Sequence, residues 1–366
     1  MTTTLLYLFA FVVVLSLVVI VHEGGHFIVA RLCGVKVTDF SMGFGKKLFS
    51  WTDKHGTCWK VCAIPLGGYV KMLGDEDAAG AKSSNKNVPK KDLNKTFMSK
   101  NLAQRAAIIF AGPAMNYVFA FVLLVGLAWG LGEVIIKPIV GSVLPDSAAA
   151  EAGLLPQDEI VSINGTKVES FVDIQRQTRL TSYGKTLNLK ILRGGIEKDI
   201  SLTPKVIDPE NDIPMIGITA AGETAIIKND LTFIQAVQTA GTTVWEATRD
   251  TLVYLSQIIS GKRAPKDMRG PLGIAEASGD ALQGGLISLI AFVAQISIAI
   301  GLMNLLPIPL LDGGHLFLYA IEAIRRKPLA EKTQTKVMWA GLCFLLAIFA
   351  YTLLLDVPRI IQRVFG

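Results

Sequence analysis

The sequence predicts a polytopic α-helical membrane protein with four transmembrane helices, a membrane-associated β-hairpin region and one inserted α+β domain. Hydrophobic residues make up 51% of the 366 residues and charged residues only 18%. The mean hydropathy is +0.45, which is too apolar for an ordinary soluble protein. Four apolar stretches are each long enough to cross a bilayer, and a polar stretch of short alternating segments separates the second from the third.

The charge pattern predicts how the chain is oriented. The net charge is +6, and a basic chain can bind nucleic acid. Here the charge gathers beside apolar stretches, so we expect no nucleic-acid partner and a positive-inside topology instead. Between Arg31 and Arg105 there are 14 Lys and Arg against six Asp and Glu. We therefore place this loop in the cytoplasm and the N-terminus outside.

The cysteines predict no disulfide framework. Cys33, Cys58, Cys62 and Cys343 follow no regular spacing, and three of them fall in the predicted cytoplasmic loop, so we expect reduced thiols. A small metal site formed by Cys58, Cys62 and His55 is the alternative, which a strand interpretation of the segment makes less favourable.

Residues 1–26 are predicted to form the first transmembrane helix. The stretch has no Lys or Arg near its start and no small-residue cleavage site after it, which favours a retained span over a signal peptide. It ends in His22-Glu23-Gly24-Gly25-His26, an H-E-x-x-H motif. Histidines four apart lie on one face of a helix and can hold one zinc ion, and the glutamate can act on a zinc-bound water. Two polar residues at a helix end are the alternative for a lone motif.

Residues 27–104 are predicted to be a cytoplasmic loop with β-hairpin or re-entrant segments. The apolar segments Val35–Phe49 and Trp59–Leu73 contain the glycine motifs Gly43-Phe44-Gly45 and Gly67-Gly68-Tyr69. Their apolarity beside a membrane helix indicates a hairpin dipping toward the bilayer, where such backbone must be covered by protein or line a wet cavity. A soluble hairpin is the alternative. Residues 77–100 have the composition of a flexible stretch.

Residues 105–132 are predicted to form the second transmembrane helix. It contains Gly112-Pro113-Ala114-Met115-Asn116, and proline and asparagine are costly in a span unless they are buried against other helices. We expect either a kink with a hydrogen-bonded asparagine or a helix packed beside the zinc-binding face.

Residues 135–206 are predicted to form the inserted domain, outside the cytoplasm by alternation of sidedness. Its expected strands are Pro138–Val143, Glu159–Ile163, Thr186–Leu192 and Lys198–Thr203, and its expected helices are Ser147–Ala152 and Ser170–Leu180. Residues 207–285 are expected to be a linker and an amphipathic helix, Leu231–Ile259, which lies on a protein or membrane surface.

Residues 286–312 and 337–355 are predicted to be the third and fourth spans, joined by the cytoplasmic loop 313–336. By topology the first and third spans both end inward, which places Asp312 at the depth of the two histidines. A carboxylate at the end of an apolar span is a functional candidate. His22, His26 and Asp312 would make a three-ligand zinc site with one open position. Asn304 could donate to a developing oxyanion or make a packing hydrogen bond.

His315 is the alternative third ligand for this site, and we expect a supporting or structural role for it. Together the motifs H-E-x-G-H, G-F-G, G-G-Y-V-K-M-L-G-D-E and N-x-x-P-x-P-x-L-D-G-G-H resemble the bacterial site-2 protease family, the intramembrane zinc metalloproteases of the RseP and RasP type. The resemblance covers nearly the whole chain.

The resemblance implies a role for each motif. It implies Zn²⁺ held by His22, His26 and Asp312, with Glu23 as the catalytic glutamate. It implies that the segments around Gly43–Gly45 and Gly67–Tyr69 bind substrate, and that the inserted domain is PDZ-like. The implied substrates are single-pass membrane proteins, such as pre-trimmed anti-sigma factors and remnant signal peptides, cleaved in regulated intramembrane proteolysis in the inner (cytoplasmic) membrane.

The sequence departs from this family at several positions. Gly24 stands where a bulky residue is usual, Lys46 where proline follows G-F-G, and Gln157 where glycine precedes Asp158. There is room for one PDZ-like domain only. Two rival functions are a catalytically silent PDZ scaffold, which would have no need of Glu23, and a metal transporter, which usually shows internal repeats or charges in several spans.

Overall fold

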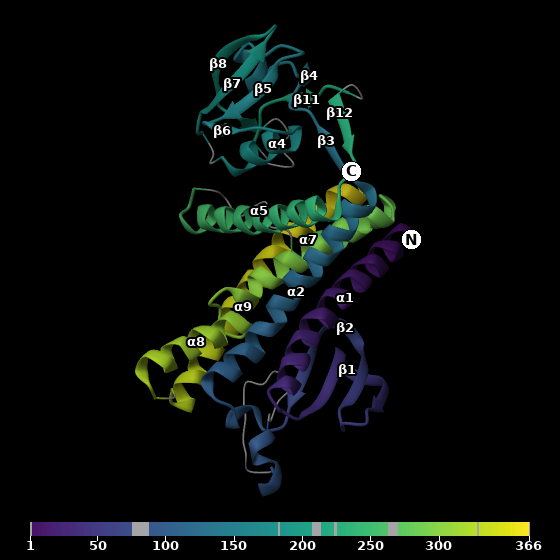
Figure 1. Ribbon diagram of the computed structural model, residues 1–366, viewed down its shortest axis with the longest axis vertical. Helices are drawn as coiled ribbons and strands as arrows, with labels where there is room; N and C mark the ends of the chain where they lie inside the picture. The colour runs from purple at the N-terminus through teal and green to yellow at the C-terminus, as the bar shows by residue number, and fades with distance from the viewer. Residues whose placement is uncertain are drawn as a thin grey trace. The chain divides into compact units, whose positions relative to one another are not determined.

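The computed structural model describes residues 2–74, 88–181, 184–206, 214–222, 225–262, 270–327 and 329–365. The chain divides into two compact units, Met1–Leu124 with Arg269–Gly366, and Val125–Met268. We call the first the helical unit and the second the β-rich unit; each is considered by itself (Figure 1).

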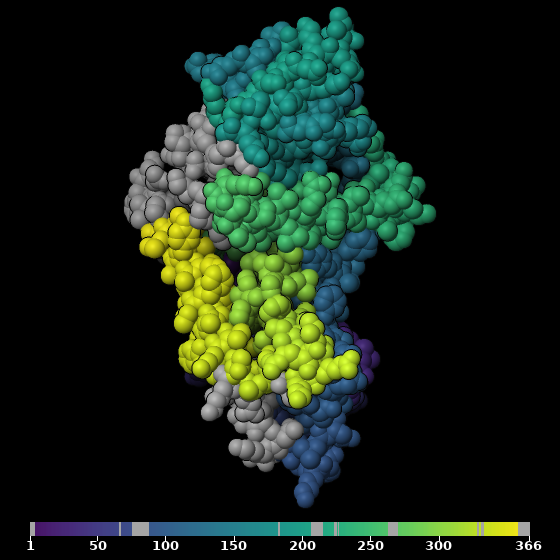
Figure 2. Space-filling model, turned by 90° about the vertical axis from the view of Figure 1, so that its left-hand side faces the viewer, coloured from purple at the N-terminus to yellow at the C-terminus, as the bar shows by residue number. Residues whose placement is uncertain are grey.

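Four helices in the described part of the chain are long and apolar enough to cross a membrane: Thr4–Leu32, Leu102–Leu131, Leu286–Leu305 and Thr333–Val357. They belong to α1 (Thr2–Leu32), α2 (Leu102–Leu131), α7 (Leu286–Leu305) and α9 (Glu331–Phe365). Four apolar helices agree with the number of spans predicted. Figure 2 shows the face of the helical unit on which α7, α8 (Asp312–Arg325) and α9 gather, coloured lime to yellow.

The first helix does not end at His26, as predicted, but continues to Leu32. The predicted end rested on the polar motif that follows the apolar run. In the structure the Arg31 guanidinium donates to Asp53 Oδ2 at 2.7 Å and to Thr57 Oγ1 at 2.9 Å. A cation in the last turn favours a helix, and the H-E-x-x-H motif lies within regular helix.

The loop after α1 forms two long, bent strands, β1 (Val37–Thr52) and β2 (Cys58–Met72), in which residues 39–42 of β1 pair with both residues 68–71 and residues 58–61 of β2. Its base packs on the end of α1 in a cluster that includes Ala30, Val35, Val37 and Met72. Residues 90–95 and 97–99 are 3₁₀ helices with Phe97 buried, so this half of the stretch predicted to be flexible is ordered by packing. Residues 77–87 lie outside the described residues.

The third span is shorter than predicted, because α7 ends at Leu305 and a separate helix, α8, begins at Asp312. Pro307 and Pro309 lack the N–H that a continuing helix needs, and each disfavours helical backbone in the residue before it. Leu310 adopts a φ of 77° in this connection. The break turns the chain so that Asp312 occupies the first turn of α8.

A helix that the sequence analysis did not predict, α6 (Pro271–Gln283), packs against α1 and α9. The buried Asp356 carboxylate on α9 accepts the backbone N–H groups of Gly270 and Gly273 at the start of α6, each at 3.1 Å. The Tyr7 hydroxyl on α1 donates to Asp280 Oδ1 at 2.8 Å. These bonds fix α6 to the first and last long helices.

The β-rich unit contains a four-stranded sheet in the order β6-β5-β7-β8: Thr166–Lys167, Glu159–Ile163, Leu187–Arg193 and Ile196–Leu202. The helices α3 (Ala148–Glu151) and α4 (Phe171–Leu180) follow strands β4 (Val140–Val143) and β6. Alternating apolar residues of these elements form the core, including Val140, Ile160, Ile174 and Leu189. The amphipathic helix α5 (Phe233–Ile259) begins with a capping box between Thr232 and Gln235.

The domain predicted to end at residue 206 continues to residue 229. Strand β11 (Ile218–Ala220) pairs with β4, and β12 (Ile226–Asn229) pairs with β3 (Glu133–Ile136), which makes a two-stranded stem at the domain's entrance and exit. Strands β9 (Lys205–Val206) and β10 (Pro214–Met215) pair with each other. Such short strands carry little periodic signal, so the sequence predicts only a linker after residue 206. Residues 207–213 and 263–269 lie outside the described residues.

Candidate metal centre and active site

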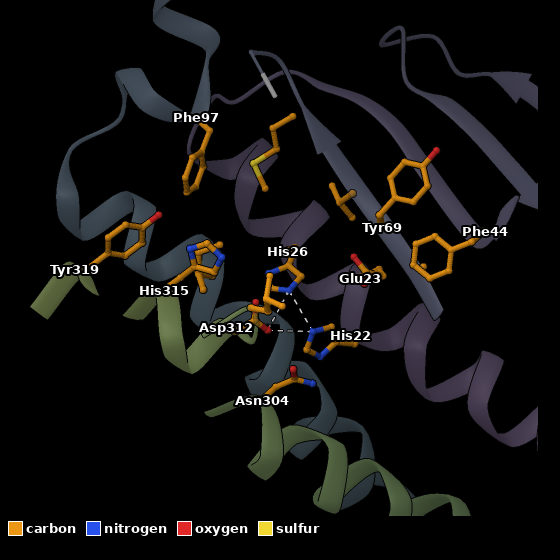
Figure 3. Close-up of a pocket in the computed structure, with 15 residues that line it drawn as sticks. His22, Glu23, His26, Phe44, Tyr69, Phe97, Asn304, Asp312, His315 and Tyr319 are labelled. Carbon is orange, nitrogen blue, oxygen red and sulfur yellow. Dashed lines mark hydrogen bonds and ion pairs between the residues drawn. The ribbon is translucent and has the colours of Figure 1, made fainter. Parts of the chain in front are cut away.

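Three ligand atoms meet at one buried point between α1, α2 and the start of α8. Figure 3 shows His22 Nε2, His26 Nε2 and Asp312 Oδ2 pointing at one another. The two nitrogens lie 3.3 Å apart, and the carboxylate oxygen lies 3.1 Å from His22 Nε2 and 3.4 Å from His26 Nε2. The structure thus brings together the three residues predicted from the motif and the topology.

This arrangement fits a zinc ion. Zn–N and Zn–O bonds of about 2.0–2.1 Å in tetrahedral geometry separate two ligand atoms by roughly 3.3 Å, which matches all three distances. Asp312 Oδ2 is buried and receives no hydrogen bond from any residue that the structure describes. Among these residues no other group of three or more His, Cys, Asp or Glu side chains converges in this way, so His55, Cys58 and Cys62 do not form a second site.

Two glycines allow the helices to approach the site. A Cβ on Gly112 of α2 would overlap His26 Nε2 and lie 2.9 Å from His22 Nε2. A Cβ on Gly25 of α1 would overlap the Ala111 carbonyl oxygen and lie 2.9 Å from Met115 Cβ. The G-P-A-M-N segment therefore packs directly on the histidine-bearing face of α1. This agrees with the expected alternative of a helix packed beside the zinc-binding face.

The predicted catalytic glutamate lies beside the three ligand atoms but does not join them. Glu23 lines a cavity of about 360 Å³ together with His22, His26 and Asp312. Gly68 of β2 lies against it, since a Cβ there would be 3.2 Å from Glu23 Cγ and 2.7 Å from the Ser41 carbonyl oxygen. A carboxylate in the cavity, next to the ligands and outside their contact, is placed to exchange a proton with a group bound there.

The predicted substrate-binding residues divide into two groups. Phe44, Gly68 and Tyr69 line the cavity, and the Phe44 and Tyr69 rings stack with centroids 6.1 Å apart. Gly43, Gly45 and Gly67 shape the hairpin beside it, with φ values of 89°, 84° and 119° that favour glycine. No third strand among the described residues pairs with β1 or β2, and residues 68–72 of β2 pair only with residues 37–42, so this part of β2 keeps one unpaired edge.

Asn304 and His315 both line the cavity without entering the ligand cluster. Asn304 Nδ2 donates to the Ile300 carbonyl at 3.1 Å, one turn back on α7. Figure 3 shows His315 on the side of Asp312 away from His22, close to Tyr319 and Phe97. Burial lowers the pKa of the His315 imidazole.

Several cavity residues had no signal in the sequence analysis. They come from β2, the 3₁₀ segment, α2, the turn before α8, and α8: Val70, Met72, Phe97, Ile109, Leu310 and Tyr319. They are ordinary apolar or aromatic residues, and only their position around the ligands distinguishes them.

The departures from the family pattern have simple structural settings. A Cβ on Gly24 would meet nothing within 4 Å, so no close neighbour requires glycine there. Lys46 is exposed on β1. Gln157 adopts a φ of 69°, which is the left-handed conformation that glycine takes easily.

Comparisons with known proteins agree with these features. The sequence pattern of peptidase family M50 matches residues 10–348. A Rhizobium meliloti protein named "Putative zinc metalloprotease" is 36% identical over 93% of both chains. The metalloprotease MmpA of Caulobacter vibrioides is 33% identical over 97% of this chain and 96% of its own.

A solved PDZ domain from an SdrC-like protein of Listeria innocua is 27% identical over 24% of this chain and 98% of its own, but its TM-score of 0.22 is too low to establish the fold. The family match covers most of the chain, and the predicted resemblance to the bacterial site-2 proteases is confirmed. The chain belongs to peptidase family M50 and is a zinc metallopeptidase.

Proposed function

We propose that this metallopeptidase cleaves transmembrane segments of single-pass membrane proteins, inside the bilayer and near its cytoplasmic side. The observation that carries the proposal is the position of the site. His26 lies about 9 Å along the axis from the end of α1, within a helix that is long and apolar enough to span a membrane. A substrate must reach this depth, and a transmembrane segment is already there.

The residues of the chain supply the acid–base chemistry and the positioning. His22, His26 and Asp312 would hold the zinc ion, which when bound lowers the pKa of water and polarises a carbonyl oxygen. Glu23 takes a proton from the attacking water and returns it to the leaving amine. Asn304 has a second N–H beyond the one donated to Ile300, and this N–H is available to an oxyanion in the cavity.

The unpaired edge of β2 supports binding of an unwound substrate. Peptide bonds in a helix are hidden by the helix's own hydrogen bonds, so a transmembrane segment must become extended before cleavage. Gly68, Tyr69 and Val70 bring β2 to the cavity wall, and an extended chain can add to such an edge as a further strand. The Phe44 and Tyr69 rings would then contact its side chains.

The finer features of the proposal rest on charge and chain order. The Lys- and Arg-rich first loop and the basic residues Arg325, Arg326, Lys327, Lys332 and Lys336 favour a cytoplasmic side. The β-rich domain then lies outside, in a PDZ-like role that selects substrates already trimmed by another protease. The proposed substrates of this kind are pre-trimmed anti-sigma factors and remnant signal peptides in the inner membrane.

The test uses the zinc-loaded chain in phospholipid vesicles with a single-pass model substrate. Wild type should cut within the apolar segment. Glu23→Gln should lose cleavage by at least about 10²-fold while retaining one zinc per chain, because Glu23 is not among the converging ligand atoms. Glu159→Gln, the same change at an exposed position of β5, is the matched control.

Three outcomes would count against the proposal. Retained cleavage in Glu23→Gln would remove the glutamate's role, and loss of zinc in that variant would make Glu23 a ligand. If wild type cleaves soluble peptides but never the apolar segment, the enzyme is a metallopeptidase of another kind. Glu23 also separates this function from the silent scaffold, which predicts equal behaviour of wild type and variant.

A further inference from the structure

Asn116 is a fully buried amide in the middle of an apolar helix. It lies on α2, has no exposed surface, and its side chain faces the His22 imidazole. Burying an amide without partners is unfavourable, because the group loses its hydrogen bonds to water and gains none in return. A residue of this kind needs either a structural bond or a function that outweighs the cost.

The side chain of Asn116 meets the metal-distal nitrogen of His22. Asn116 Nδ2 lies 3.2 Å from His22 Nδ1, whereas Oδ1 is buried without a partner among the described residues. The oxygen and nitrogen of a terminal amide exchange places by a half turn. The structure therefore records one of two orientations, and in this one the oxygen is unsatisfied.

Zinc binding selects the other orientation. A histidine that ligates through Nε2 must keep the lone pair on that atom, so in the neutral ring the proton is on Nδ1. An Nδ1–H needs an acceptor, which the NH₂ group of an amide cannot be. Turning the amide brings Oδ1 to Nδ1–H and satisfies the oxygen and the imidazole together.

His26 is held in the same way by the same helix. Its Nδ1 lies 2.8 Å from the Ile108 backbone carbonyl, which can only accept. His26 is thereby fixed in the tautomer that leaves Nε2 free for the ion. Asn116 supplies the equivalent acceptor for His22, and Gly112, between the two acceptors along α2, leaves room for both rings.

We propose that Asn116 is a positioning residue of the metal centre, which holds His22 in its zinc-binding tautomer through a hydrogen bond from Nδ1–H to the amide oxygen. The proposal rests on His22 as a zinc ligand and is independent of the substrate proposed above. Zinc binding therefore tests it even for an enzyme whose substrate class proves different.

The experiment measures zinc affinity of the full chain in detergent by competition with a chelator, at about pH 8 where free imidazoles are neutral. Asn116→Leu, of similar size but without an acceptor, should bind zinc about 10- to 100-fold more weakly, as is usual for loss of a group that orients a ligand. Asn116→Asp retains an acceptor oxygen at the same position and should lose less than tenfold. The visible spectrum of Co²⁺-loaded protein should change in Asn116→Leu and be preserved in Asn116→Asp.

Ser297→Ala is the matched control. Ser297 Oγ donates to the Asn116 backbone carbonyl at 2.9 Å and is also fully buried. Its removal disturbs the packing of α2 on α7 but not the amide, so zinc affinity should stay near that of wild type. A purely structural role for Asn116 predicts instead that Ser297→Ala and Asn116→Leu weaken zinc binding together.

The order of affinities decides the proposal. Equal zinc affinity in wild type and Asn116→Leu would overturn it, and so would equal weakness in Asn116→Leu and Asn116→Asp. If Asn116→Leu does not fold, Asn116→Ala, which fits the space with a smaller side chain, carries the same expectation and the same contradiction.

Discussion

Both units of the molecule bury apolar and polar residues, but they differ in what their surfaces expose and in how their buried polar groups are partnered. The core of the β-rich unit is apolar, with Ile160, Ile174 and Leu189 almost completely enclosed. The helical unit encloses His22, His26, Asn116, Ser297 and Asp356, while its outer surface carries apolar side chains such as Leu5, Phe9 and Leu286. Apolar surroundings stabilise apolar surfaces, so in such a unit burial alone does not explain which residues are inside. The buried polar residues show where its specific interactions are.

Buried charges in the two units also differ in their partners. In the β-rich unit the Asp158 carboxylate accepts two hydrogen bonds of 2.7 Å from the Arg193 guanidinium. Burial alone would raise the pKa of this carboxyl, but the guanidinium holds it below its ordinary value. In the helical unit Asp312 Oδ2 faces two imidazole nitrogens and accepts no hydrogen bond from the described residues. The ion pair of Asp158 with Arg193 stabilises the fold. The atoms that converge at Asp312 have no other partner and are available to bind a metal ion.

The largest expected effect comes from the glycine at which α2 approaches the two histidines. Gly112→Ala should abolish zinc binding and with it cleavage, because the methyl group would overlap His26 Nε2 and lie 2.9 Å from His22 Nε2. Gly126→Ala on the same helix is the control, since a Cβ there meets nothing within 4 Å. Zinc content after gel filtration checks the pair. Full zinc occupancy in Gly112→Ala would mean that α2 does not pack on the histidines as described.

The second prediction removes most of the β-rich unit while leaving the metal centre. Ile136 of β3 and Ile226 of β12 are paired, so an Asn-Gly turn can replace residues 137–225 without stretching the chain. Zinc should stay bound, because every proposed ligand lies in the helical unit. What should change is the ratio of cleavage rates for a trimmed and an untrimmed version of one model substrate.

The comparison of the two substrates needs an internal control. Glu23→Gln in the shortened chain should cleave neither substrate, which shows that any new cleavage comes from the same site. If the shortened chain retains its zinc and its rate ratio equals that of wild type, the β-rich domain does not select substrates. If the shortened chain cleaves both substrates faster than wild type by the same factor, the domain limits access of every substrate to the site.

The two units also differ in how far the sequence predicted them. In the β-rich unit, the strands and the helix expected from short apolar segments match β5, β7, β8 and α4 within about two residues. The pairing of β11 with β4 was missed, because it joins segments far apart in the chain through three or four residues each. Short non-local pairs leave no periodic pattern in the sequence.

In the helical unit, chemistry was easier to predict than geometry. The spacing of His22 and His26 and the predicted topology placed Asp312 beside them, which the structure shows at 3.1 and 3.4 Å. The helix α6 was missed because small residues dominate it; a Cβ on its Gly279 would overlap the Tyr7 ring. Likewise, an asparagine in a span indicated a buried partner, but only the structure identifies that partner as His22.

The smallest expected effect concerns backbone strain in the β-rich unit. Gln157 has a φ of 69°, a conformation that costs an ordinary residue about 1–2 kcal/mol. Gln157→Gly removes this cost but adds unfolded-state freedom worth about 0.5–1 kcal/mol, so we expect a net stabilisation of roughly 0.5–1 kcal/mol.

Asn164, in the turn between β5 and β6, also has a positive φ, 50°, but its Oδ1 accepts the Asn188 N–H at 2.9 Å. Asn164→Gly should therefore destabilise the domain, because asparagine tolerates this backbone and the bond is lost. Hydrogen exchange of the Ile160 and Leu189 amides in the full chain measures both changes, with slower exchange expected in the first variant and faster exchange in the second. If both variants shift exchange in the same direction, backbone conformation at Gln157 is not what limits the stability of this domain.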